Sequence, residues 1–236
     1  MIDLSKVTYF LADGRSLQKD QEDNLRRIVS FAQKRVKFHC IKLALVENPN
    51  IEGTEWISIT PMGIGGYCDF CLNKMADYIE SDFVLIFQQD GFIVNPDRWN
   101  PEFLNYDYIG APWGPIKSPS VGNGGFSLRS RKLLKRVKSV SCPQECNEDG
   151  VFCSLAPQLE REGFRYAPVD VARRFSIEMK IDGEHLASEC FGQHRFHLNR
   201  LTRTMPMETF AATIDKANSL VPDVSSGALS LLTHRV

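Results

Sequence analysis

An acidic residue directly follows the most apolar segment of the chain. Five apolar residues, 83–87, are followed by Gln88, Gln89, Asp90 and Gly91. A continuous apolar run of this length is typical of a strand that is buried on both faces, in the centre of a parallel sheet. A carboxylate at the carboxyl end of such a strand lies where open α/β sheets bind ligands. Asp90 therefore indicates a ligand-binding site or, as the alternative, the start of an Asp-Gly turn.

Three glycines surround Asn123 in a second segment that could bind a ligand. The order Gly122-Asn123-Gly124-Gly125 lets a backbone pass close to a bulky polar ligand, because glycine tolerates conformations that other residues avoid. The segment lacks the Gly-Lys-Ser/Thr of a P-loop and the spacing of a dinucleotide-binding loop. We expect added bulk here to damage binding rather than folding, and a flexible turn is the alternative.

Two adjacent carboxylates, Glu148 and Asp149, stand at the predicted start of a helix. Such residues commonly cap a helix and complement its dipole, which favours their ionised form. An ionised carboxylate near the edge of a sheet can also act as a general base on an alcohol. Both interpretations remain open from these residues alone.

Two histidines, His194 and His197, follow a glycine late in the chain. Imidazole and carboxylate together suit Mn²⁺ or a similar ion, so His194 and Asp90 form a candidate pair of ligands. Four arginines are candidate partners for phosphates, although most such side chains are solvated: Arg129, Arg131, Arg173 and Arg174.

These side chains must be positioned by an alternation of strands and helices. We expect strands near residues 7–12, 38–46, 56–59 and 83–90, and helices near 20–36, 67–80, 129–137 and 149–162. This alternation predicts a parallel, doubly wound sheet in one domain. The segment 95–125 is rich in Pro, Gly and Asn, which suits loops that build a site on a rigid sheet.

The bulk composition excludes some functions. The net charge of −1 over 236 residues gives no basic field for nucleic acid. No apolar run approaches the roughly 20 residues of a membrane span, and the N-terminal residues lack the pattern of a signal peptide. We expect a cytoplasmic protein without a transmembrane segment, in which peripheral membrane association is the alternative.

Seven cysteines are scattered along the chain, and reduced thiols are the expectation for a cytoplasmic protein. Cys68-x-x-Cys71 and Cys142-x-x-x-Cys146 could supply four thiolates to zinc. However, Cys71 falls on the apolar face of a predicted helix, where a free thiol is usually a small buried hydrophobe. The pattern therefore favours structural thiols over zinc.

Several blocks of the sequence resemble a poorly characterised family of glycosyltransferase-like domains. The most specific blocks are Leu85–Asp90, Tyr106–Trp113 and Gly122–Arg129. The likeness continues in the same order through Glu148-Asp149, Phe175–Glu178 and Gly192-x-His194, and it covers roughly residues 80–197.

The resemblance implies a GT-A-type fold, which is a Rossmann-like, mostly parallel central sheet flanked by helices. It implies a glycosyltransferase domain over residues 1–204, with a nucleotide-binding half (1–95) and an acceptor and donor-sugar half (96–204). Residues 205–236 have no counterpart, and we expect them to form a C-terminal docking helix and tail.

The resemblance also implies roles for particular residues. In many such enzymes an Asp-x-Asp motif holds the metal, whereas this chain has Gln88-Gln89-Asp90. The implied ligands of Mn²⁺ or Mg²⁺ are therefore Asp90 and His194. The implied catalytic pair is Glu148 and Asp149, with Asp149 as the base. The remaining implied contacts are Ala12, Asp13, Arg15, Gln89 and Asp90 for the nucleotide, Asn123, Gly124 and Gly125 for the donor sugar, and Trp113 for the acceptor.

The implied function is inverting, metal-assisted transfer of a sugar from a nucleotide diphosphate, with a UDP-sugar favoured. The implied acceptor is a hydroxyl of a glycan or glycolipid, in glycan or polysaccharide synthesis. A non-catalytic module that binds carbohydrate or nucleotide sugar is one alternative, because one acidic position of the metal motif is absent. A sugar-nucleotide pyrophosphorylase is another, but the segment Leu11–Arg15 has a single glycine where those enzymes carry a Gly-rich basic loop.

Overall fold

A six-stranded sheet forms the centre of the molecule. The computed structural model describes residues 1–113, 121–142, 147–178, 185–194 and 206–219. Within them the strand order is β3-β2-β1-β4-β7-β6. The strands are β1 (Ile2–Asp13), β2 (Val36–Leu45), β3 (Glu55–Ser58), β4 (Phe83–Ile86), β6 (Tyr108–Gly110) and β7 (Ser127–Ser130).

The sheet is mixed. The pairs β2–β3, β1–β2 and β1–β4 are parallel, whereas β4–β7 and β6–β7 are antiparallel. The expectation of a mostly parallel sheet is therefore wrong at this end of the sheet. Parallel neighbours need a crossover connection, usually a helix, but the described residues between β6 and β7 form none, and β7 returns antiparallel. β4 is nevertheless the buried inner strand that its apolar sequence predicts.

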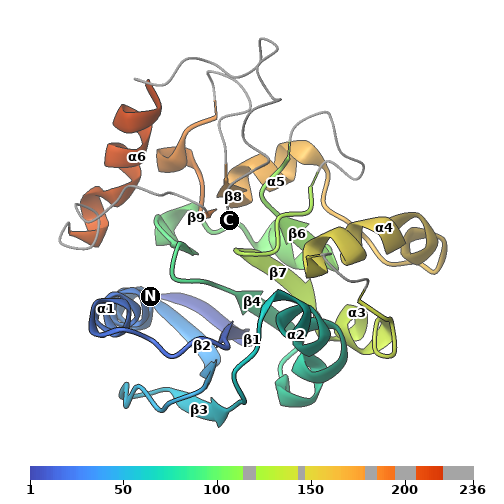
Figure 1. Cartoon of the computed structure of the whole chain (residues 1–236). Helices are drawn as coiled ribbons and strands as arrows, with labels where there is room; N and C mark the ends of the chain where they lie inside the picture. The colour runs from blue at the N-terminus through green and yellow to red at the C-terminus, as the bar shows by residue number, and fades with distance from the viewer. Residues whose placement is uncertain (114–120, 143–146, 179–184, 195–205, 220–236) are drawn as a thin grey trace.

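Helices cover both faces of the sheet. The side chains of β1 alternate: Tyr9 and Leu11 pack with α1, and Phe10 and Ala12 pack with α2, α3 and α4. Figure 1 shows α1 apart from these three helices, on the other side of the strands. The helices are α1 (Lys19–Arg35), α2 (Ile64–Asp69), α3 (Arg131–Arg136), α4 (Glu148–Arg161), α5 (Val169–Phe175) and α6 (Phe210–Ser219).

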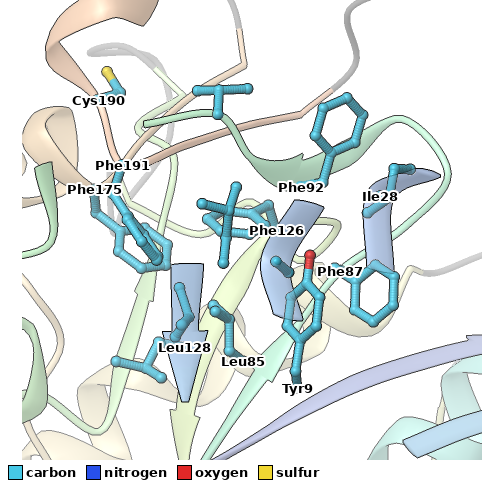
Figure 2. Packing of buried hydrophobic residues seen from close by; sticks show 14 of the residues in the cluster. Tyr9, Ile28, Leu85, Phe87, Phe92, Phe126, Leu128, Phe175, Cys190 and Phe191 are labelled. Carbon is cyan, nitrogen blue, oxygen red and sulfur yellow. The ribbon is translucent and has the colours of Figure 1, made fainter. Parts of the chain in front are cut away.

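A small second sheet lies above the carboxyl end of β4. Its order is β5-β9-β8, with β5 (Gly91–Ile93) antiparallel and β8 (Ser176–Ile177) parallel to β9 (Gly192–His194). An aromatic core joins the two sheets, as Figure 2 shows around Phe126. The ring of Phe126 lies 5.3 Å from that of Phe175 and 6.0 Å from that of Phe191, between centroids. This packing fixes β9 relative to the main sheet.

Short 3₁₀ and π turns complete the described structure. The single helix expected over 67–80 begins earlier, as α2, and continues as the π turn η1 (Phe70–Lys74) and the 3₁₀ turn η2 (Met75–Tyr78). The wider π turn buries three consecutive side chains, those of residues 70–72. The other turns are η3 (Pro96–Arg98), η4 (Pro101–Asn105), η5 (Ala187–Glu189) and η6 (Met207–Thr209).

The C-terminal helix docks on the core, as the sequence predicts. The ring of Phe210 in α6 lies 5.1 Å from that of Phe92 in β5, edge to face. The expected boundary at 204/205 and the tail 220–236 lie outside the described residues. In the described chain, no helix has both the length and the apolar character that crossing a membrane requires.

A disulfide corrects the expectation that the thiols are reduced. Cys68 in α2 is bonded to Cys142, which is 74 residues later in the chain. The zinc tetrad, which the sequence disfavoured, is not formed with these two sulfurs, and Cys146 lies outside the described residues. Cys71 is a free, buried thiol, as its place on an apolar face predicts. The spacing of the cysteines could not show this pairing, because the pairing depends on a tertiary contact between Cys142 and α2.

We predict that the Cys68–Cys142 bond stabilises the fold. It closes a long loop, so Cys142→Ser should lower the free energy of unfolding by about 2–4 kcal/mol, measured by urea denaturation. A reductant should lower the stability of the wild type similarly and leave Cys142→Ser unchanged. Cys40→Ser, which removes a free thiol, should keep the response to reductant. Equal stability of wild type and Cys142→Ser without reductant would contradict a stabilising bond.

Candidate functional site

The sheet brings the predicted site residues to one edge. The pairing of β1 with β4 ends at Phe10 and Ile86, three residues before the end of β1, and β7 begins opposite the same Ile86, at Ser127. Because β7 is antiparallel to β4, the glycine-rich segment before β7 lies at the carboxyl end of β4. The segments after β1, after β4 and before β7 therefore meet at this edge.

Asp90 lies in a tight turn after β4. The backbone of Gln88 donates to the carbonyl of Gly91 at 2.7 Å, and the backbone N–H of Gly91 donates to the carbonyl of Gln88 at 3.2 Å. The Asp-Gly turn is thus present, but it leaves the carboxylate of Asp90 38% exposed, with Oδ1 at 3.8 Å from His194 Nε2. Asp90 both shapes the turn and faces His194.

His194 is the centre of a buried polar cluster. Its Nε2 lies 3.2 Å from Gln88 Oε1, and its Nδ1 lies 3.0 Å from Asn123 Nδ2 and 3.5 Å from Glu178 Oε1. Residues of β9, the turn after β4, the glycine-rich loop and the segment after β8 thus surround one imidazole. His194 is only 9% exposed, so these partners enclose its ring.

The amide of Asn123 sets the proton position on His194. Asn123 Oδ1 accepts from the backbone N–H of Phe126 at 3.4 Å, which directs Nδ2 to His194 Nδ1. Nδ1 is then the acceptor, and Nε2 carries the proton toward Gln88 Oε1. If a metal were bound at Nε2, the proton of the imidazole would have to be on Nδ1, and Nδ1–H would then donate to Glu178 Oε1 in place of the bond from Asn123.

The cluster suits a metal that is shared with a ligand. Among the described residues, no group of three or more His, Cys, Asp or Glu is placed to hold an ion. Asp90 and His194, with the amide oxygen of Gln88, offer two oxygens and one nitrogen, which suit Mn²⁺ or Mg²⁺. Mg²⁺ sites commonly combine one or two carboxylates with substrate phosphates. The residues therefore fit an ion held jointly with a diphosphate, and not one held by the protein alone.

The residues expected to bind the nucleotide lie beside this cluster. Arg15 forms two hydrogen bonds to Asp13, at 2.9 and 2.8 Å. The pKa of Arg15 is raised, mainly by those bonds and further by the charge of Asp90. The parallel pairing of β1 with β4 carries Arg15 to the edge of the sheet at which β4 ends. Ala12 is buried in the core beneath them. Gln89 is tied to α1, because Asn24 Nδ2 donates to its side-chain and main-chain oxygens, each at 3.0 Å.

Glycine is required at two positions of the loop 123–125. A Cβ on Gly125 would overlap the ring of His194. A Cβ on Gly124 would overlap Glu148 Oε1 and lie 2.9 Å from Arg129 Nη2. The loop is thus packed between His194 on one side and the start of α4 on the other. We expected added bulk in this loop to affect binding rather than folding. That expectation is incomplete, because the packing alone leaves no room for a larger side chain at Gly124 or Gly125.

The adjacent carboxylates at the start of α4 have different surroundings. Glu148 is buried and forms an ion pair with Arg129 at 3.0 Å. Asp149 is half-buried, and its two oxygens accept from the backbone N–H groups of Gly124, at 3.3 Å, and Gly150, at 2.7 Å. The sequence suggested Arg129 as a candidate partner for phosphate, but its guanidinium is already paired with Glu148.

The pKa of Asp149 is raised to about 6. Burial is the main cause and the neighbouring Glu148 the second, while Arg129 and the N–H groups of Gly124 and Gly150 act in the opposite direction. The sequence predicts only that the helix N-terminus favours the ionised form, whereas burial opposes it. A carboxylate with a pKa near 6 remains mostly ionised at neutral pH and is a stronger base than an ordinary aspartate.

Two further residues of the site, Tyr67 and Glu178, were missed in the sequence. The hydroxyl of Tyr67 accepts from Gln88 Nε2 at 3.2 Å, and Glu178 faces His194. Glu178 stands in a block that carries the family resemblance, which was its only signal. Trp113, the expected acceptor contact, lies against Gly122, where a Cβ would be 2.8 Å from its ring. His197 and the residues after it, to 205, lie outside the described chain.

Comparison with known proteins places the chain in a family without an assigned function. The chain belongs to the family described as protein of unknown function (DUF5672), whose model matches residues 60–194, more than half of the sequence. A solved structure described as a glycosyltransferase involved in the glycosylation of the major capsid of PBCV-1 aligns with 91% of this chain and 99% of its own, at a TM-score of 0.48 and 12% identity. No curated protein matches the sequence. The family match covers all of the site except the residues that follow β1.

We predict that Gly124→Ala destabilises the fold, because the added methyl would overlap a buried ion pair. The free energy of unfolding should fall by about 1–3 kcal/mol, measured by urea denaturation. Gly65→Ala is the matched control: a Cβ there meets nothing within 4 Å, and the residue is helical. It should be neutral or stabilising by up to about 1 kcal/mol. Equal stability of the two variants would show that the loop has room at Gly124.

Proposed function

We propose that this protein is a glycosyltransferase that moves a sugar from a nucleotide diphosphate to an acceptor hydroxyl. One observation carries the proposal: the loop 123–125 joins a carboxylate of raised pKa, Asp149, to the Asp90–His194 cluster. A base poised near neutral pH and a donor set for a diphosphate-bound ion are the two parts that such a transfer needs. The family resemblance noted in the sequence agrees with this assignment and with a GT-A-type fold.

Asp149 is the proposed base. Its two hydrogen bonds from backbone N–H groups hold the carboxylate at the loop, and its pKa near 6 leaves it ionised at pH 7. It takes the proton of the acceptor hydroxyl as the oxygen bonds to the anomeric carbon and the diphosphate leaves. One base opposite the leaving group is sufficient for inversion. Glu148 is not suited to this role, because Arg129 holds its carboxylate in the core.

The donor side is proposed at the ends of β1 and β4. Asp90 and His194 would hold Mn²⁺ or Mg²⁺ together with the diphosphate of the donor, for which a UDP-sugar is favoured. When bound, the ion stabilises the negative charge of the leaving diphosphate as a Lewis acid. Arg15 adds a cation at the same edge. The loop 123–125 lines the donor sugar, and Trp113 meets the acceptor, a glycan or glycolipid.

A binding module is the second candidate. Only one carboxylate, Asp90, ends β4 where an acidic pair would hold a metal more tightly. A protein that binds a nucleotide sugar and does not transfer it would satisfy the same donor geometry. The raised pKa of Asp149 favours the enzyme, because binding alone requires no base.

We predict that a metal ion and a nucleoside diphosphate bind jointly. UDP with Mn²⁺, at 100 times the dissociation constant, should stabilise the fold by about 2.7 kcal/mol, and EDTA should remove most of this effect. Asp90→Asn should weaken joint binding, measured by calorimetry, because it removes a negatively charged ligand. Asp97→Asn, an exposed carboxylate in η3, is the matched control and should bind as the wild type. If UDP bound to the wild type in EDTA, and to Asp90→Asn in Mn²⁺, as tightly as to the wild type in Mn²⁺, a metal at this site would be excluded.

We predict that Asp149→Asn abolishes most transfer and keeps donor binding. The asparagine is isosteric but cannot take a proton, so the rate of transfer should fall by about 10²–10⁴-fold with little change in donor affinity. The wild-type rate should also fall as the pH drops through about 6, because the base becomes protonated. Transfer is followed by release of UDP from a panel of UDP-sugars and acceptors.

The anomeric configuration of the product tests the route. An inverted product, observed by NMR, agrees with Asp149 as base. Transfer at the wild-type rate by Asp149→Asn would exclude it as the base. Donor binding without transfer to any acceptor would instead favour the binding module.

A further inference from the structure

Arg129 and Glu148 form an ion pair that is closed to solvent. Arg129 Nη2 lies 3.0 Å from Glu148 Oε1, and the two side chains are 0% and 6% exposed. Arg129 Nε also donates to Ser127 Oγ at 3.1 Å. The guanidinium carbon lies 4.5 Å from the ring centre of Phe152 and 5.1 Å from that of Tyr108. The carboxylate, the hydroxyl and the two rings replace part of the water that this cation loses, while its Nη1 is buried without a hydrogen-bond partner among the described residues.

Such a pair is not needed for stability. Replacing a buried ion pair by apolar side chains of similar volume is often neutral or stabilising, whereas removing one partner is costly. The position of the pair is more informative. Glu148 is the first residue of α4 and Asp149 the second, while Arg129 comes from β7, directly after the loop that contacts Asp149.

We propose that Arg129 is a positioning residue for the base Asp149 and acts through Glu148. The ion pair holds the first turn of α4 against Gly124 and cancels the negative charge that stands next to the base. This inference rests on the proposed function of Asp149. It assigns to Arg129 a part in the reaction without contact to the substrate.

Packing around Gly124 supports the mechanical part. A Cβ on Gly124 would lie 2.9 Å from Arg129 Nη2, 3.0 Å from Asp149 Cβ, and would overlap Glu148 Oε1. The ion pair and the base therefore contact the same backbone position. If Glu148 left the ion pair, the first turn of α4 would move. Asp149, the next residue of that turn, accepts a hydrogen bond from the backbone N–H of Gly124 and would move with it.

The charges around Asp149 support the electrostatic part. Glu148 raises the pKa of Asp149, and Arg129 lowers it. Cys71 of η1 and Tyr108 of β6 also face this carboxylate, but burial raises their pKa values well above the ordinary range, so both are neutral near pH 6. Glu148 and Arg129 are thus the charged groups that control the ionisation of Asp149 among the described residues.

The test is a carboxyl ¹³C NMR titration of Asp149 in the full chain, which requires no substrate. The signal is identified by its loss in Asp149→Asn. Arg129→Met should raise the pKa of Asp149 from about 6 to about 7 or above, because Glu148 is left unbalanced. Glu148→Gln should lower it to about 5 or below, because Arg129 is left unbalanced. The double variant, with neither charge, should return it to near the wild-type value.

Arg129→Lys is the conservative control. It keeps the charge, so the pKa of Asp149 should stay near its wild-type value even where the fold is less stable. If Arg129→Met does not fold, Glu148→Gln decides the question by the direction of its change. If neither single variant folds, Arg129→Lys/Glu148→Gln decides the question: a pKa of Asp149 below the wild-type value supports the proposal, and an unchanged pKa overturns it. An unchanged pKa in a folded single variant also overturns it.

The test separates this inference from the proposed function. If Asp149→Asn transfers sugar at the wild-type rate, Asp149 is not the base, yet the order of the pKa values can still hold. If Asp149→Asn loses transfer and Arg129→Met leaves the pKa unchanged, only the role of Arg129 is overturned. Where transfer is measurable, the acidic limb of the pH profile should move in the same order as the NMR values.

Discussion

The antiparallel pairing of β7 with β4 is the constraint on which the site depends. Ser127 at the start of β7 is opposite Ile86 at the end of β4. A parallel β7 would begin at the opposite edge of the sheet, and the loop 123–125 would lie far from Asp90. The reversal instead places the loop over the turn after β4, and the same strand carries Arg129 to the start of α4.

Close packing then determines what the loop can be. His194 reaches the site on β9, whose place is fixed by the aromatic core around Phe126. Its ring lies so near Gly91 and Gly125 that a side chain at either position would meet it, at 2.7 Å in the case of Gly91. The glycines are therefore explained by the approach of an imidazole on one side and of α4 on the other, and not by a need for unusual backbone angles.

Much of this arrangement was visible in the sequence, and the rest depended on tertiary contacts. The apolar run 83–87 predicts the buried β4, and the position of Asp90 at its end follows from that run alone. The direction of β7 could not be predicted, because the segment 126–128 reads as a strand in either orientation. The Cys68–Cys142 bond and the burial of Arg129 were missed for a similar reason. Each joins elements that are distant in sequence or that pack only after the sheet has formed, and an arginine beside a serine reads as a surface residue.

The pair Glu148-Asp149 shows how a helix gives two like residues different tasks. Consecutive side chains on a helix point about 100° apart, so the first turn of α4 can direct one carboxylate inward and the next toward the loop. Glu148, facing the core, needs a partner and has Arg129. Asp149, facing the loop, receives two backbone N–H groups and keeps part of its surface open. Burial raises its pKa to about 6 and the charge of Glu148 adds to the rise, while Arg129 acts in the opposite direction. On the proposed function, the buried arginine therefore helps the second acid to stay ionised and to act as a base at neutral pH.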